Sequence, residues 1–86
     1  MKINREDVAA KLRGYLRHEI ALSELVDWAE QAMFDGEFED EHFEAIRDSV
    51  AKLGLADVKE FGLTWEDCES LLKRLGYSMH VDVVSV

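Results

Sequence analysis

The 86-residue chain is long enough for one domain, and its 48% hydrophobic content excludes a disordered protein although 34% of its residues are charged. The formal charge of −9 is unevenly distributed. Residues 1–20 carry five basic and three acidic side chains, residues 21–50 one basic and ten acidic, and residues 51–86 four basic and six acidic. Phosphate backbones need clustered Lys and Arg, so this acidic middle argues against nucleic acid as a partner.

Targeting and membrane signals are also missing from the sequence. The opening MKINREDVAAKL lacks the apolar core of a secretory signal, and the longest apolar runs are far below the ~20 residues of a membrane span. The single cysteine, Cys68, excludes an internal disulfide and fits a reducing compartment. We therefore expect a cytoplasmic protein that does not contact membranes.

Two helices are predicted in the first half of the chain. The first runs from about residue 5 to residue 18 after the N-cap Asn4. The second runs over residues 22–34, because its apolar stripe has a new phase, and we expect Gly36 to close it in the left-handed conformation. The two stripes comprise Val8, Leu12, Tyr15 and Leu16, and then Leu22, Leu25, Val26, Ala29 and Met33.

The second half predicts two further helices. One begins near Asp40 and is closed by Gly54, which we also expect in the left-handed conformation. Residues 57–60 are interpreted as one short helical turn. The last helix follows the N-cap Thr64 and is closed by Gly76 in the same way. Its buried face is predicted to contain Trp65, Cys68, Leu71, Leu72 and Leu75, and we expect core packing for Trp28 and Tyr77 as well.

The pattern changes after Gly76. Residues 79–86 alternate and are rich in β-branched side chains, so they predict a strand. Its one candidate mate within the chain is residues 1–3, and a two-stranded ribbon is marginal by itself. The strand can pair with that of a second copy across a two-fold axis, or it can add to the sheet edge of another protein. Of the two we expect the homodimer, with Met79, Val81 and Val83 on the face toward the core. The predicted fold is a single mainly α domain, residues 1–86: a compact bundle of four helices plus a short helical turn, with the C-terminal β-strand.

No motif predicts catalysis or a cofactor. A twelve-residue calcium loop beginning at Asp35 would place Asp40 at the required glycine and Ile46 at the required glutamate, so two positions fail. The three histidines have no zinc spacing, and a site with Cys68 and His80 would lack two ligands. Serines, histidines and the cysteine show no nucleophile signature, and the glycines form no phosphate loop. We expect neither an enzyme nor a bound metal or cofactor.

Two stretches of the sequence carry a resemblance. They are Tyr15-Leu16 with Glu24-Leu25-Val26-Asp27-Trp28-Ala29, and Gly62-Leu63-Thr64-Trp65-Glu66-Asp67-Cys68 with Leu75-Gly76-Tyr77. The chain thereby resembles short acidic bacterial proteins of unassigned function, over most of its length. A Ser or Thr cap is expected near position 21 in such sequences, whereas this chain has Ala21. The resemblance implies a bacterial, cytoplasmic protein and carries over no functional residues.

The function that these observations favour is a non-catalytic protein–protein interaction module. The alternative is an acidic immunity-type inhibitor that neutralises a basic toxin, whose association would be fast and sensitive to salt. A small enzyme is the third alternative. The interaction residues predicted besides the C-terminal face form an acidic run: Asp35, Glu37, Glu39, Asp40, Glu41 and Glu44.

Overall fold

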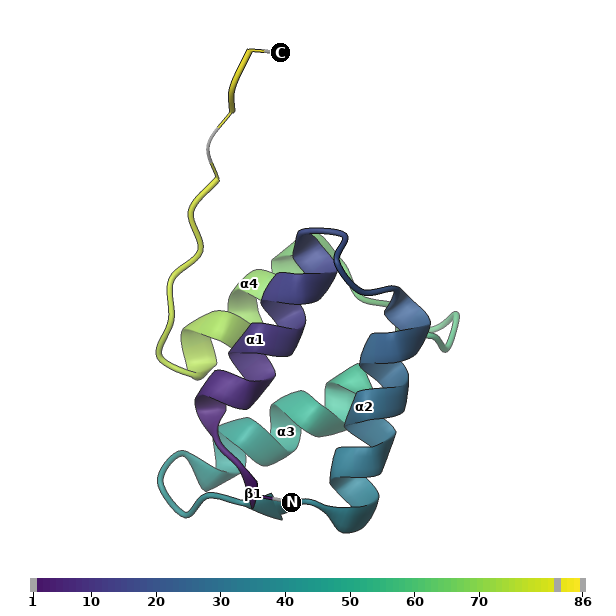
Figure 1. Ribbon diagram of the computed structural model, residues 1–86, viewed down its shortest axis with the longest axis vertical. Helices are drawn as coiled ribbons and strands as arrows, with labels where there is room; N and C mark the ends of the chain where they lie inside the picture. Colours follow the sequence, from purple (N-terminus) through teal and green to yellow (C-terminus); the bar gives the residue numbers. More distant parts are fainter. Residues whose placement is uncertain (1, 82, 86) are drawn as a thin grey trace.

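The chain is mainly helical in the computed structural model, which describes residues 2–81 and 83–85 (Figure 1). Met1, Asp82 and Val86 lie outside the described residues. The described part contains the predicted number of helices and one small sheet. The elements in chain order are β1 (Lys2–Ile3), α1 (Arg5–Leu16), α2 (Leu22–Asp35), β2 (Glu37–Phe38), α3 (Phe43–Leu53) and α4 (Trp65–Arg74).

Capping boxes begin α1 and α4. The Asp7 amide donates to the Asn4 side chain and the Asn4 amide to the Asp7 carboxylate, both at 2.9 Å. At α4 the Asp67 amide donates to the Thr64 hydroxyl at 3.1 Å, and the Thr64 amide donates to the Asp67 carboxylate at 2.9 Å. Each box satisfies backbone donors that the first turn of a helix leaves free. Both predicted caps are therefore confirmed.

The other two helices begin without a side-chain cap. Ala21 precedes α2, where only the Glu24 carboxylate accepts a bond from the Ala21 amide, at 3.4 Å. The helix α3 starts later than predicted, because His42 adopts a left-handed φ of 65° and the Phe43 amide donates to the Asp40 carbonyl. Glu39, Asp40 and Glu41 therefore belong to a loop between β2 and α3.

The helix α3 occupies the centre of the packing. It contacts α1, α2, α4 and β2 (Figure 1). The side chains of Ile46, Val50 and Leu53, on its inner face, have no exposed surface. Residues from every other helix complete the same cluster: Val8, Ala9, Leu12, Leu25, Ala29, Ala32, Cys68, Leu71, Leu72 and Leu75, together with Ile3 from β1. Burial of this apolar surface is the main force that holds the helices together.

The left-handed conformation predicted for three glycines is wrong at two of them. Gly36 has a φ of −74° because the chain passes directly from α2 into β2 and must be extended there. Gly54 has a φ of −64° because the chain continues into right-handed turns, in which the amides of Leu55 and Ala56 donate to carbonyls three residues earlier. Residues 57–60 belong to this series of turns and form no helix. Only Gly76, with a φ of 93°, is left-handed as predicted.

The sheet corrects the predicted strand pairing. Lys2 and Ile3 pair in parallel with Glu37 and Phe38, and the Glu39 amide donates to the Ile3 carbonyl at 2.9 Å. Residues 79–81 and 83–85 form no strand. Figure 1 gives the reason: β1 lies at one end of the globule, where Ile3 is buried in the core, whereas residues 83–85 lie beyond the other end.

Candidate functional site

Metal-binding side chains do not gather into a metal centre in the described part of the chain. No group of three or more His, Cys, Asp or Glu residues among residues 2–81 and 83–85 is placed to hold a metal ion. Cys68 is 1% exposed, and burial raises the pKa of its thiol, so its thiolate is disfavoured. No helix in the described residues is both long and apolar enough to cross a bilayer.

The most distinctive feature is an extended segment, residues 78–81 and 83–85, which we call the arm. Gly76 turns the chain at the end of α4, and the Tyr77 amide donates to the Leu72 carbonyl at 2.8 Å. Beyond this point Figure 1 shows the arm leaving the helices. Exposure rises along it from 62% at Val81 to 94% at Val83, with 76% at Val84.

The root of the arm is fastened to α1. The Tyr77 hydroxyl donates to the Glu6 carboxylate at 2.7 Å, and the Arg5 guanidinium lies 5.2 Å from the centre of the Tyr77 ring. Arg5 also donates to the Leu75 carbonyl at 3.2 Å. These contacts join residues about 70 positions apart in the chain. The arm therefore starts from a fixed point, while its valines are left in solvent.

The Glu6–Tyr77 bond predicts a change in titration. The pKa of Glu6 lies below its ordinary value, chiefly because Tyr77 donates a hydrogen bond to the carboxylate and secondly because Arg13 does. A depressed pKa stabilises the fold above the unfolded value near 4.5, and this stabilisation is lost as the pH falls through the folded pKa. In Tyr77→Phe we expect the pKa of Glu6 to rise toward its ordinary value, as measured by carboxyl NMR titration. Tyr15→Phe is the control; an unchanged Glu6 pKa in Tyr77→Phe would contradict the bond.

A groove of about 680 Å³ lies between the arm, α1 and α4. Its walls are mostly apolar, with two arginines and a histidine at their margin. Its lining comprises Ala9, Arg13, Leu16, Arg17, Trp65, Leu72, Tyr77, Ser78, Met79, His80 and Val81. We call it the arm groove.

The arm groove corrects two predictions. Trp65 was expected in the core but is 47% exposed, because it begins α4 at the edge of the packing and lines the groove. Of the predicted inward face of the arm, only Met79 packs against the core. Val81 and Val83 are exposed because no other element of the described chain follows the arm outward (Figure 1).

The six predicted acidic residues run from Asp35, the last residue of α2, through β2 to Glu44 in the first turn of α3, and we call them the acidic edge. Five are exposed and Glu39 is half-buried. Asp35 accepts a hydrogen bond from Gln31, and Glu41 lies 3.5 Å from the His42 ring. Within the described residues, none of the six lies within 4.0 Å of a Lys or Arg nitrogen. The arm and the acidic edge thus form two separate surfaces.

An apolar surface that the sequence did not predict lies between α2 and α3. Phe34 is 87% exposed, Met33 49% and Leu55 44%. With Glu30, Ala51 and Gly54 they line a shallow hollow of about 540 Å³, which we call the α2–α3 patch. Met33 was predicted in the buried stripe, and that prediction is wrong. Phe34 lies outside the apolar stripe predicted for this helix, and that position was the signal in the sequence for its exposure.

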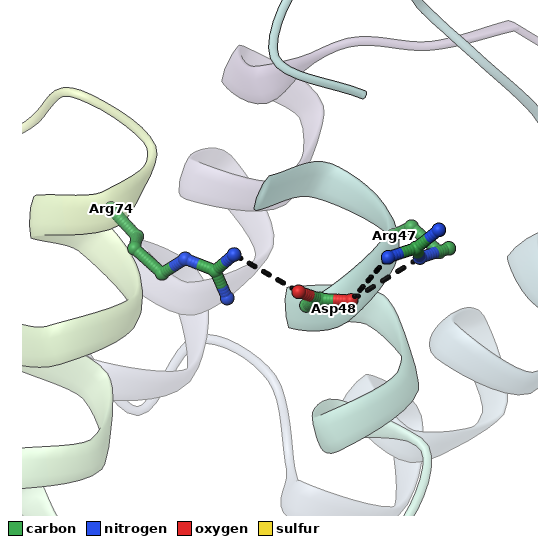
Figure 2. A network of polar contacts seen from close by, with 3 residues as sticks. All are labelled: Arg47, Asp48 and Arg74. Atoms are coloured by element: carbon green, nitrogen blue, oxygen red, sulfur yellow. Dashed lines mark hydrogen bonds and ion pairs between the residues drawn. The ribbon is translucent and has the colours of Figure 1, made fainter. Parts of the chain in front are cut away.

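Two nearby cations on α3 are already paired. Figure 2 shows Asp48 between Arg47 on its own helix and Arg74 on α4, at 3.2 Å and 2.9 Å. The pKa of Asp48 is lowered chiefly by the Arg74 hydrogen bond and then by that of Arg47. Lys52 lies 3.5 Å from Asp67 of α4. The Asp48–Arg74 and Lys52–Asp67 pairs join α3 to α4, and together with the Arg47–Asp48 pair they leave little positive charge free near the α2–α3 patch.

No protein-family model matches the chain, and no curated protein or solved structure is significantly similar to it. The geometry of these surfaces is therefore the basis of the functional proposal.

Proposed function

We propose that the protein is a non-catalytic protein–protein interaction module that assembles as a homodimer through its arm. The observation that supports this is the exposure of Val81, Val83 and Val84 on an extended segment whose root is fastened to the domain. β-branched side chains favour strand pairing, and an extended backbone without a ladder partner attracts a second strand.

A second copy of the chain is the simplest partner for the arm. Two arms related by a two-fold axis run antiparallel, and each then supplies the backbone donors and acceptors that the other lacks. The adjacent arm groove offers an apolar wall, including Trp65 and Leu16, for valines of the opposite arm. A domain of this size has a small core, so burial of the arms would add appreciably to its stability.

The proposed location is the bacterial cytoplasm. The lone, buried Cys68 fits a reducing compartment, because secreted domains of this size usually depend on disulfides. The sequence resemblance to acidic bacterial proteins supports the same assignment.

The dimer is tested by light scattering on the full chain and on a version truncated after Ser78. We expect the full chain to have the mass of a dimer at high micromolar concentration and the truncated version that of a monomer. Val83→Asp with Val84→Asp should also give a monomer, because charges would be buried between the arms. Phe61→Asp, which changes an exposed apolar side chain elsewhere, is the matched control and should remain dimeric. A monomeric full chain, or a dimer that survives truncation, would show that the arm does not assemble the protein.

Inhibition of a basic toxin is the second candidate function. The acidic edge supports it, since its carboxylates have no Lys or Arg partner within ion-pair distance in the described chain. Such binding would weaken strongly as ionic strength rises, whereas pairing of two arms would depend little on salt.

A further inference from the structure

The α2–α3 patch combines the most exposed aromatic side chain of the described residues with a hollow beside it. Phe34 is 87% exposed, yet an aromatic ring of this size normally contributes to a core or an interface. Met33 and Leu55 extend the apolar surface. Ala51 and Gly54 also line the hollow, and their small size leaves space in it. The hollow lies between two packed helices, which is the geometry that accepts the side chains of a third.

The charge around the patch is one-sided. Residues 21–60 contain twelve acidic and three basic side chains, and two of those three, Arg47 and Lys52, are paired with Asp48 and Asp67. Glu30 lines the hollow itself, and Asp35 directly follows Phe34. These two carboxylates place negative charge beside the apolar surface.

The end of α2 adds to this negative charge. Backbone carbonyls at a helix C-terminus carry partial negative charge, and basic residues usually lie there. The last turn of α2 contains Asp35 and no basic residue. An acidic residue at the C-terminus of a helix is locally unfavourable. Such departures from local stability are expected at functional surfaces.

We propose that the α2–α3 patch is a docking site for a cationic amphipathic helix of a partner protein. Its apolar side chains would cover Phe34, Met33 and Leu55, and its Lys or Arg side chains would face Glu30 and Asp35. An anionic membrane surface is a poor occupant, because the same acidic groups repel it. This inference rests on the proposed interaction function and names its partner class, but it does not require the dimer.

The test uses a labelled synthetic peptide of about 15 residues, near the shortest length at which good helix formers are helical. Leu occupies the positions of one helical face and Lys the others. Fluorescence anisotropy measures its affinity at near-physiological salt, and backbone amide NMR shifts locate the contact. We expect the largest shifts at the three apolar patch residues. We expect a peptide with Glu in place of every Lys, or Ser in place of every Leu, not to bind.

Matched variants separate this site from general attraction to an acidic protein. Phe34→Ser and Glu30→Lys should each weaken binding about tenfold or more, as expected at an anchor residue. Phe61→Ser and Glu69→Lys alter an equivalent exposed ring and an equivalent exposed acid elsewhere, and should change affinity by less than about twofold. The proposal would be overturned if the Phe61 and Glu69 variants lost as much peptide affinity as the Phe34 and Glu30 variants. It would also be overturned if the unaltered protein did not bind the peptide.

The same variants distinguish failure of this inference from failure of the proposed assembly. Phe34→Ser should keep the dimer mass, and the version truncated after Ser78 should keep its peptide affinity. If the peptide does not bind while the arm-dependent dimer persists, only the patch assignment is wrong. If peptide binding persists in a protein that is monomeric throughout, only the arm assembly is wrong.

Discussion

Replacement of Leu53 by Ala is expected to lower the free energy of unfolding by about 2–5 kcal/mol, the range for removing a fully buried leucine side chain. Leu53 is the last residue of α3, the helix that contacts all three others, and its side chain has no exposed surface. The loss combines the apolar surface returned to water with the cavity that the neighbours cannot fill. Domains are stable by roughly 0.05–0.15 kcal/mol per residue, so this loss is a large fraction of the total stability.

Leu55→Ala is the matched control for this experiment. The same chemical change is made two residues away, where the side chain is 44% exposed, so we expect a much smaller loss of about 0.5 kcal/mol. Urea denaturation followed by circular dichroism measures both variants. Equal losses of unfolding free energy in the two variants would mean that α3 does not occupy the centre of the core.

Replacement of Gly76 by Val is expected to cost about 1–2 kcal/mol, because a β-branched residue is strained in the left-handed region. Gly76 has a φ of 93°, and a Cβ atom there would lie 2.5 Å from the Arg5 guanidinium. That guanidinium would have to leave the Leu75 carbonyl and the Tyr77 ring. The variant should therefore also loosen the root of the arm.

Gly54→Ala is the control at the other glycine that was predicted to be left-handed. Its φ is −64°, and an added Cβ would meet its nearest neighbours at an ordinary 3.6 Å. Alanine is up to about 1 kcal/mol better than glycine in a helix, so we expect an unchanged or raised melting temperature. A thermal melt in which Gly76→Val behaves like the unaltered protein, or in which Gly54→Ala is the less stable variant, would contradict these backbone conformations.

Local interactions account for what the sequence by itself determined. Capping boxes at Asn4 and Thr64 act over three residues, and apolar stripes repeat within a single helix, so the number of helices and the position of most of them follow from neighbouring residues. The acidic run is likewise a property of composition.

Only the tertiary structure decided which apolar residues are covered and where the chain turns. Gly36 is extended because β2 must pair with β1, a contact between segments some 35 positions apart that no local pattern encodes. Trp65 and Met33 fit the helical stripes and were predicted to be buried, yet they are 47% and 49% exposed because they lie at the edge of the packing. The extended arm has strand-forming residues, but a strand needs a partner, and the described part of one chain supplies none. Burial and pairing depend on what lies opposite a residue, and that is set by the packing of the whole domain.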